Sequence, residues 1–516
     1  MVSRLKTEDS LNKRYTYKLG TNLIGLAIGA VTLGIVPRGL GPVAYGNFNF
    51  LSNFFTQTVG FLEMGTSLCF FTKLSQRQGD HGIVSFYFRF SLLIMMVVTI
   101  FLLLARVLGV SGRIWPDQQV SFVFVAALLA FLMWFSQVLG NMSDAYGITT
   151  SAEKMKVLQK ALGAVAVAAL FLSGTLNLAT YFSCQLAIVA LLIGAFFAVL
   201  RKSSPFRGMS WRLDSAATKS YVREFSKYSH PLIVYAFFSS FLPGIADRWL
   251  LQVFGGSIQQ GFFGLSYQIC GVCLIFTTAM TPLLMREFSI AHGRNDLNHM
   301  AVLFRRYIPM LFAVAAFFSC FIAVQADKVV ALFGGAKYAG AGMAVAIMAF
   351  YPMCQTYGQL SGSVFFATGQ TGLYRNIGVL FNLIGLPVTY FLIAPAGKFG
   401  LDAGAMGLAV KTVGLSFVVV NVQLWFNARL LSLPFRKFVA HQLGTILILV
   451  LTAAAVAKCA DLLTSSLLVS FVVSGIFYLL GSAGILFLLP SMFSMTRREL
   501  LSNVGRCGLY VKQCFA

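Results

Sequence analysis

Apolar runs of about 20 residues recur along the whole chain, separated by short clusters of charge, glycine and proline. A helix needs about 20 mostly apolar residues to cross the hydrocarbon core of a bilayer, so each run predicts a membrane-spanning helix. We therefore expect an all-α polytopic membrane protein with about 14 transmembrane helices. Their approximate cores are 17–36, 47–71, 84–108, 119–141, 157–174, 178–200, 229–253, 261–284, 306–326, 340–363, 373–394, 404–427, 440–459 and 466–489.

The basic residues gather on one side of these predicted spans. With a cytoplasmic N-terminus, 30 of the 39 Lys and Arg residues are assigned to the inside, counting those near the inner ends of spans, and Arg248 and Lys411 are assigned to the spans themselves. Cytoplasmic loops of membrane proteins carry an excess of Lys and Arg, so both termini are predicted to be cytoplasmic. The first 20 residues contain no recognisable signal peptide. Most of the net charge of +23 thus reports topology.

The composition excludes several functional classes. Hydrophobic residues make up 58% of the chain and charged residues 11%, which does not fit a basic protein that binds nucleic acid. The external connections are all short and leave no room for an external catalytic domain, so we do not expect an enzyme. The nine cysteines are scattered, and the pair Cys270 and Cys273 has no histidine nearby, so no metal site is expected.

An internal repeat organises the chain. Three matched segments recur at offsets of 215, 214 and 222 residues: 41–46 with 256–261, 73–79 with 287–293, and 145–147 with 367–369. Such repeats define the two lobes of many transporters, related by an axis along the membrane normal when their orientation is the same. The predicted domains are a six-helix lobe (1–200), a basic cytoplasmic connector (201–228), a second six-helix lobe (229–428), and two further helices with a basic tail (429–516).

Polar side chains form stripes on several predicted spans. In the second span they recur on one face, which suits a water-filled cavity better than an isolated hydrogen bond, although hydrogen bonding between helices is the alternative. Similar polar positions occur in the fourth, tenth and twelfth spans. The candidate cavity-lining residues are Asn49, Asn53, Gln57, Gln137, Asn141, Gln355, Gln359 and Asn421.

Charges within or beside spans are candidates for function because burying them is costly. Asp247 and Lys411 lie at a similar depth in the second lobe, and we expect them to form an ion pair. Arg248 points about 100° away from Asp247 and reaches either a substrate or lipid headgroups. Glu63 and Asp144 join Asp247 as candidates for ion coupling.

Two pairs of helix-distorting residues complete the candidate features. Pro243 and Gly244, just before Asp247, permit a bend in the seventh span. Gly25 and Gly29 form a G-x-x-x-G motif in the first span, which predicts close helix packing.

Several short motifs occur along spans 1 to 12. They are Pro37-Arg38-Gly-Leu-Gly-Pro-Val-Ala-Tyr-Gly46, Phe61-Leu-Glu-Met-Gly65, Asp247-Arg248, Gly261-Phe-Phe-Gly-Leu-Ser-Tyr267, Thr281-Pro282, Ala367-Thr-Gly369 and Gly400-Leu-Asp-Ala-Gly-Ala405. Together these motifs resemble the Wzx-type polysaccharide flippases, a branch of the multidrug/oligosaccharidyl-lipid/polysaccharide exporter superfamily. The resemblance covers most of spans 1 to 12 and implies two MATE-like lobes. Glu63 departs from it, because the family often has Asp there, and a second proline is absent around Met285 and Arg286.

The resemblance implies a function in the cytoplasmic membrane. The protein would move an undecaprenyl-pyrophosphate-linked oligosaccharide to the outer leaflet by alternating access, for O-antigen, capsule or exopolysaccharide synthesis. Arg38, Arg248 and Lys411 are the candidates for meeting the pyrophosphate. No cofactor is expected beyond a coupling H⁺ or Na⁺, and the partners are the lipid-linked substrate, membrane lipids and the polymerase and chain-length machinery, without nucleic acid.

Two other functions remain open from the sequence. A drug antiporter of the same superfamily would hold cationic drugs with carboxylates of its cavity. A membrane-bound glycan polymerase or acyltransferase would need an extended external loop or a constellation of catalytic residues near an interface, and neither is evident.

Overall fold

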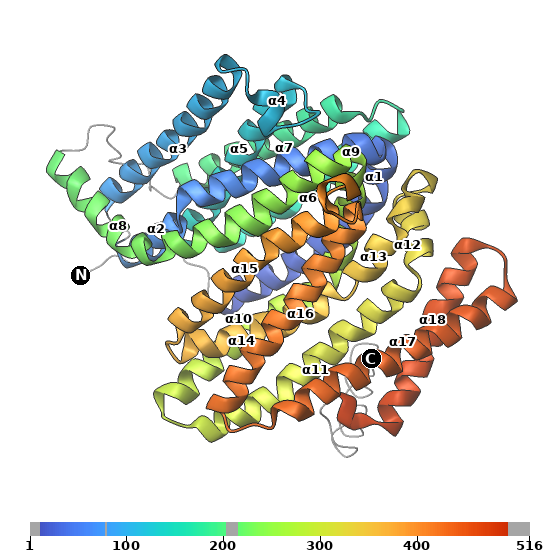
Figure 1. Cartoon of the computed structure of the whole chain (residues 1–516). Helices are drawn as coiled ribbons and strands as arrows, with labels where there is room; N and C mark the ends of the chain where they lie inside the picture. The colour runs from blue at the N-terminus through green and yellow to red at the C-terminus, as the bar shows by residue number, and fades with distance from the viewer. Residues whose placement is uncertain (1–10, 78–79, 203–214, 494–516) are drawn as a thin grey trace, which may run out of the picture. The chain divides into compact units, whose positions relative to one another are not determined.

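The computed structural model describes residues 11–77, 80–202 and 215–493, and this part of the chain contains helices and no strands (Figure 1). The first half contains α1 (Leu11–Glu63), α2 (Thr66–Gln76), α3 (His81–Val107), α4 (Ser111–Ile114), α5 (Val120–Ala145), α6 (Thr149–Leu172), α7 (Leu178–Lys202), α8 (Ser215–Ala236), the π-helix η1 (Phe237–Ala246) and α9 (Asp247–Gly271).

The second half continues in the same all-helical manner. It contains η2 (Val272–Leu274), α10 (Ile275–Gly293), α11 (Leu297–Val324), α12 (Ala326–Phe333), η3 (Ala336–Ala341), α13 (Gly342–Met348), α14 (Tyr351–Ala367), α15 (Thr371–Ile393), η4 (Ala396–Lys398), α16 (Gly404–Leu430), α17 (Phe435–Leu463), α18 (Leu467–Leu488) and η5 (Pro490–Phe493).

The chain divides into two compact units. The first unit comprises Met1–Gly264 with Thr389–Gly404, and the second comprises Leu265–Val388 with Ala405–Ala516. The helix α9 therefore begins in the first unit and ends in the second. The predicted lobe boundaries at 200 and 229 stay a prediction.

Every predicted span coincides with helix, but several spans are merged or broken. Ten helices are long and apolar enough to cross a membrane by themselves, or eleven if one bent pair is counted as a span. This count is three lower than the 14 predicted spans for two reasons. The first and second predicted spans share the helix α1, and the seventh and eighth share the bent pair, so each of these two pairs is counted once. The tenth predicted span is divided between α13 and α14, each too short to be counted. Pro352 lies in the first turn of α14, where proline is tolerated because the N–H group that it lacks would have no partner within the helix.

The predicted seventh span is part of a longer helix. The described part of α8 runs from Ser215, so residues 215–228 of the predicted connector are helical and continuous with the span. Residues 203–214 of the predicted connector lie outside the described residues. The span then widens into the π-helix η1, which contains Pro243 and Gly244. A proline removes one backbone donor, and a local π-helix is one way in which a span accommodates that loss.

The internal repeat is confirmed by backbone geometry. Gly41 interrupts α1 with φ 73° and ψ 169°, and Gly256 interrupts α9 with φ 68° and ψ −172°. Gly147 and Gly369, at the offset of 222 residues, follow α5 and α14 with φ 77° and 72°. Glycine adopts positive φ at little steric cost, so the sequence keeps glycine wherever both copies make the same turn.

The helices that follow the second and eighth spans also start alike. The side chain of Asp80 accepts hydrogen bonds from the backbone N–H groups of Gly82 and Ile83 at the start of α3. Asp296 accepts one from His299 at the start of α11. These caps satisfy backbone donors that have no partner within the helix.

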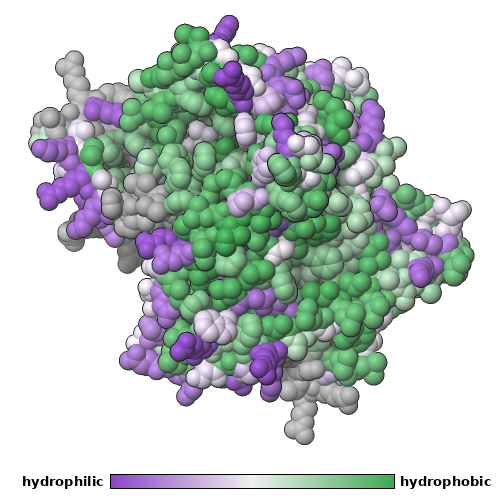
Figure 2. Space-filling view, viewed as in Figure 1, coloured by the Kyte–Doolittle hydropathy of each residue, from purple (hydrophilic) through white to green (hydrophobic). Residues whose placement is uncertain are grey.

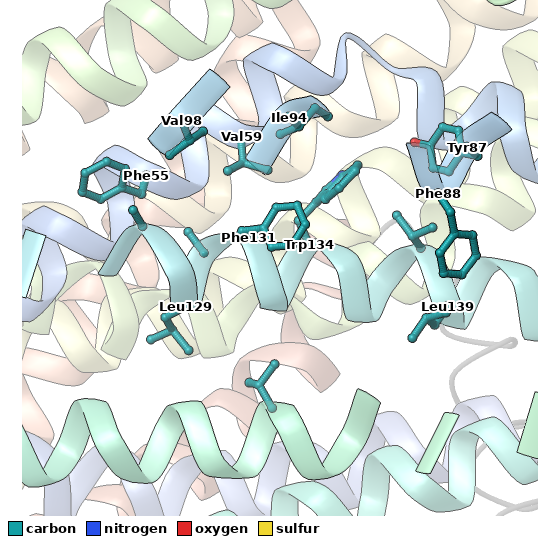
Figure 3. Close-up of a cluster of buried hydrophobic side chains, with 14 of the residues drawn as sticks. Phe55, Val59, Tyr87, Phe88, Ile94, Val98, Leu129, Phe131, Trp134 and Leu139 are labelled. Carbon is teal, nitrogen blue, oxygen red and sulfur yellow. The ribbon is translucent and has the colours of Figure 1, made fainter. Parts of the chain in front are cut away.

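Each unit has its own apolar core. In the first unit, Phe55 and Val59 of α1, Phe88 of α3 and Phe131 and Trp134 of α5 gather around α5 (Figure 3). Many large apolar side chains remain exposed on the outer faces of the spans, and green residues cover much of the face in Figure 2. Exposed apolar surface on this scale fits lipid as the surrounding solvent.

An ionic cluster joins the end of α2 to α8 within the first unit. Lys73 Nζ lies 2.8 Å from Glu224 Oε1, and Arg77 pairs with the same carboxylate. Tyr221 donates a hydrogen bond of 2.7 Å to Asp80, and burial raises the pKa of Tyr221 to about 12. The hydrogen bond from Lys73 holds the pKa of Glu224 below its ordinary value of 4.5.

This cluster predicts a pH-dependent contribution to stability. Because the folded pKa of Glu224 is lowered, its ion pairs stabilise the fold above pH 4.5 and are lost as the pH falls below that value. Glu224→Gln is expected to lower the free energy of unfolding by about 0.5–1 kcal/mol at pH 7. Unfolding curves of both proteins between pH 7 and pH 3.5 should converge at the acid end; a constant difference would contradict the assignment.

Candidate functional site

Two turns related by the repeat cross each other in the first unit. A Cβ atom added to Gly46 would collide with the backbone carbonyl of Ser257, and one added to Gly261 would collide with that of Pro42. Both pairs of residues, 42 with 257 and 46 with 261, are related by the repeat offset of 215. The crossing is therefore reciprocal, and glycine is required at both positions because only a residue without Cβ lets two backbones approach this closely.

The polar stripe of the second span lies against the seventh and eighth spans. Asn53 donates a hydrogen bond of 2.6 Å to the backbone carbonyl of Gly244 in the π-helix. Gln57 packs on the same glycine, and Asn49 packs on Gly264 while donating to the carbonyl of Tyr45. All three side chains are half-buried. Two of these three amides thus hydrogen-bond to backbone carbonyls, and their role in lining a cavity stays a prediction.

Arg248 is held by residues of the turn that follows it. Its guanidinium donates a hydrogen bond of 3.3 Å to Gln260, whose side-chain amide donates back to the carbonyl of Arg248. The guanidinium also lies 4.3 Å from the ring centre of Phe263. This cation–π contact and the reciprocal amide bonds orient the side chain within the first unit, which does not fit a side chain that extends freely to lipid headgroups.

Asp247 is almost completely buried and accepts a hydrogen bond from the hydroxyl of Thr389 on α15. The distance is 2.7 Å, and only 4% of Asp247 and none of Thr389 is exposed. A buried carboxylate needs such donors, because transferring it from water without them is costly. The ion pair between Asp247 and Lys411 stays a prediction.

The Asp247–Thr389 bond predicts a measurable stability effect. Thr389→Val removes the hydroxyl while keeping the shape, and is expected to lower the free energy of unfolding by about 1–3 kcal/mol. Thr389→Ser keeps the donor and serves as the matched control. Thermal unfolding of the purified protein in detergent measures the difference, and equal stability of the Val and Ser variants would disprove a role of the hydroxyl.

One lysine in each unit lies against the middle of a predicted span. A Cβ on Gly385, near the middle of the span 373–394, would lie 3.2 Å from Nζ of Lys411, which is buried. A Cβ on Gly25, near the middle of the span 17–36, would collide with Nζ of Lys160 on α6. In both cases a glycine leaves room for an ammonium group at membrane depth.

Lys160 faces a small recess of about 220 Å³ between α1, α6 and α7. Its lining includes Thr32, Gln159, Tyr181 and Gln185, a set of hydroxyl and amide groups unusual for the interior of a membrane span. The G-x-x-x-G motif predicts close helix packing, but Gly29 has no neighbour within 4 Å beyond its own helix, and Gly25 meets a lysine side chain rather than another backbone. The motif therefore makes space for a cation.

The other predicted cavity residues fall into two groups. On α5, Gln137 is exposed while Asn141 and Asp144 are half-buried on the same helix face. In the second unit, Gln359 of α14 accepts a hydrogen bond of 3.3 Å from Thr281, and Asn421 pairs with Gln442 of α17 at 3.4 Å. The hydrogen bonds between Asn421 and Gln442 connect the twelfth predicted span to the thirteenth. Gln355 is half-buried on α14.

Glu63 and Arg38 both lie beside breaks in the first two spans. Glu63 accepts a hydrogen bond of 3.0 Å from the backbone N–H of Ser67, across a break at Met64 and Gly65 where φ is positive. It thereby helps start α2. Arg38 is exposed, three residues before the turn at Gly41. Their roles in coupling and phosphate binding stay predictions.

Lys160 was not identified as a site residue from the sequence, because nearby lysines suggested that it lies on the cytoplasmic side of the membrane. Lys154 and Lys156 lie close by on the cytoplasmic side, and the count of basic residues assigns Lys160 to the same group. The backbone of Lys160 lies only three residues, about 4.5 Å, from the cytoplasmic end of the predicted span 157–174. The structure nevertheless brings its Nζ atom against Gly25, near the middle of the first predicted span. A signal was present: a lysine within the predicted span 157–174, together with glycines in the first span.

No protein-family model and no curated protein sequence matches the chain. Several solved structures share its fold, including the following two. The lipid II flippase MurJ in an inward closed conformation superposes with a TM-score of 0.66 at 13% identity, covering 92% of this chain and 99% of that one. An inward-facing multidrug resistance MATE family transporter of the MOP superfamily gives a TM-score of 0.59 at 16% identity, covering 83% and 99%. The chain thus has a MurJ- and MATE-like fold and is a multi-pass membrane protein.

Proposed function

We propose that this protein moves a lipid-linked oligosaccharide, carried on undecaprenyl pyrophosphate, from the inner to the outer leaflet of the cytoplasmic membrane. Both termini lie in the cytoplasm in this proposal. The headgroup enters between the two six-helix lobes, the lipid tail stays in the bilayer, and the lobes rock about the bound headgroup, as expected of transporters built from repeats. The flipped unit would then pass to a polymerase and its chain-length machinery.

The observation that carries the proposal is the pair of lysines at mid-span glycines. Lys160 and Lys411 bring positive charge to the depth at which a headgroup must cross. An intramembrane cation is expensive and is retained where it meets an anionic group. A pyrophosphate is such a group, and it accepts charge-assisted hydrogen bonds from ammonium and guanidinium groups. Arg38 and Arg248 are proposed as further contacts along the same path.

The polar amides support a glycan as cargo. Asn49, Gln57, Gln137 and Gln355 are half-buried or exposed within spans, so their amide groups are accessible in part. Amides donate to and accept from sugar hydroxyls. Glu63, Asp144 and Asp247 are proposed to couple transport to H⁺ or Na⁺.

A drug antiporter is the main alternative, since a MATE transporter shares the fold. Cationic drugs would be repelled by Lys160, whereas an anionic lipid headgroup would be attracted, and this charge favours the flippase. An enzyme of glycan polymerisation or acyl transfer is less well supported. The external connections of this chain in the predicted topology are short, and the sequence shows no constellation of catalytic residues near an interface.

A deletion strain distinguishes these functions. We expect it to lose a surface polysaccharide and to accumulate the lipid-linked unit in the inner leaflet, with both defects reversed by the wild-type gene. Increased sensitivity to cationic dyes with an intact surface glycan would instead favour the antiporter. Purified protein that elongates or acylates the lipid-linked substrate would favour the enzyme.

A further inference from the structure

A large apolar groove lies on the first unit between α3, α5 and α7, with a volume of about 750 Å³. Four phenylalanine rings form its wall. The ring of Phe135 lies 5.4 Å from Phe88, 6.0 Å from Phe131 and 6.4 Å from Phe197, measured between centroids. Phe88 and Phe131 are buried and therefore rigid, whereas Phe197 is 36% exposed. The groove is thus a preformed apolar surface that a hydrocarbon chain can follow.

The depth of the groove matches one leaflet. Measured from the cytoplasmic ends of the predicted spans, the four rings lie about 5–15 Å into the bilayer at 1.5 Å per residue. Half of the hydrocarbon core is about 15 Å thick. The groove therefore occupies the inner leaflet and does not extend across the membrane.

A cation lies at the cytoplasmic end of the groove. Among the described residues, Arg201, the last residue but one of α7, is the only charged residue that lines it, and its side chain is exposed. The other polar lining residue, Ser91, uses its hydroxyl to donate to the carbonyl of Tyr87 at 2.9 Å. An apolar wall with one guanidinium at the headgroup level is complementary to a lipid with a negatively charged phosphate.

In the second unit, the wall equivalent to this groove is covered by a helix. There, Met353, Cys354 and Tyr357 of α14 line a smaller cavity of about 270 Å³ that is closed by Gln442 and Ile446 of α17. These three α14 positions are related to Phe131, Leu132 and Phe135 of α5 by the repeat offset of 222. The walls correspond, but only the second unit carries an appended helix on its wall in the part of the chain that is described.

The means of attachment differ between the two walls. The α17 helix is tied to its wall by the amide pair of Gln442 and Asn421. In the part of the first unit that the structure describes, no amide side chain lines the groove, and Arg201 provides a cation at the lipid–water interface instead. An interfacial cation anchors a lipid headgroup, whereas a membrane helix is better held by polar groups at depth.

We infer that this groove is a binding site for an anionic phospholipid of the inner leaflet, with its acyl chain on Phe88, Phe135 and Phe197 and its phosphate on Arg201. The inference rests on the proposed orientation, with both termini in the cytoplasm, and does not depend on the identity of the transported molecule.

Native mass spectrometry of the purified full-length protein tests the site, with phosphatidylglycerol as the anionic probe and phosphatidylethanolamine as the zwitterionic one. The wild type should bind phosphatidylglycerol more tightly. Arg201→Gln should weaken that binding about tenfold, to the level of phosphatidylethanolamine. Arg223→Gln, which removes an exposed cation on α8, is the matched control and should bind like the wild type.

A second variant fills the groove. Ile193→Trp places a large ring on the wall and should weaken the binding of both lipids, while a thermal unfolding curve verifies that the variant is folded. Equal phosphatidylglycerol affinity of the Arg201→Gln and Arg223→Gln variants would overturn the inference. Unchanged lipid binding by folded Ile193→Trp would also overturn it. If this variant in addition lost a membrane protein that co-purifies with the wild type, the groove would bind that protein and not a lipid.

Discussion

Replacing Gly46 or Gly261 by alanine is expected to destabilise the first unit by about 1–3 kcal/mol, although each change adds a single methyl group. The added Cβ would collide with the carbonyl of Ser257 or of Pro42, and backbone cannot move aside as a flexible side chain can. Because the two contacts are reciprocal, each substitution should separate the two crossing turns. Thermal unfolding and the yield of monodisperse protein in detergent measure the effect.

The same helices supply matched controls. Gly60 in α1 and Gly271 in α9 have no neighbour within 4 Å of an added Cβ beyond their own helices. Alanine at either position is expected to be neutral or slightly stabilising, since alanine favours a helix by up to about 1 kcal/mol over glycine. If all four variants were equally stable, the close crossing of the turns would not be the reason for glycine at Gly46 and Gly261.

Removing the ammonium group of Lys160 or Lys411 is expected to reduce transport by about tenfold or more in each case, because a charge-assisted hydrogen bond to phosphate contributes about 1.5–3 kcal/mol. Lys160→Ala and Lys411→Ala would be compared for restoration of surface glycan in the deletion strain, at equal amounts of membrane protein. Lys160→Arg keeps the charge and should retain more activity than the alanine variant.

Lys219→Ala is the control for a general loss of positive charge. Lys219 is exposed on α8 and lies outside the predicted spans, so this variant should transport like the wild type. Lys411→Ala carries a risk of misfolding because the side chain is buried. Lys160→Ala does not, since Lys160 is exposed. Full activity of folded Lys160→Ala would therefore remove the observation on which the proposed function depends.

The helices and the repeat were predictable because both depend on local patterns. A run of 20 apolar residues has few stable states other than a spanning helix. The glycines of the two copies recur because the same positive-φ turn is needed twice, as Gly41 and Gly256 show. Helix ends were harder to predict. The breaks at Met64 and Gly65, and at Ala349 and Phe350, interrupt apolar runs without changing their hydropathy.

The candidate site was predictable only in residue type. Charged and amide side chains within spans, such as those of Asp247 and Asn53, can be recognised from sequence as candidates because placing them in a membrane costs free energy. Their hydrogen-bond partners cannot be recognised from sequence, because Thr389 lies 142 residues from Asp247, and the acceptor of Asn53 is a backbone carbonyl 191 residues away. Lys160 shows the same limit, since only the packing of α6 on α1 brings its ammonium to Gly25.

The central claim is tested most directly by reconstitution. Purified protein would be incorporated into liposomes that carry a fluorescent undecaprenyl-pyrophosphate-linked oligosaccharide, and movement between leaflets would be followed by quenching from one side. The account predicts that the wild type accelerates this movement and that the double variant of Lys160→Ala and Lys411→Ala does not. Equal rates for wild-type protein and protein-free liposomes, or for wild type and the folded double variant, would contradict it.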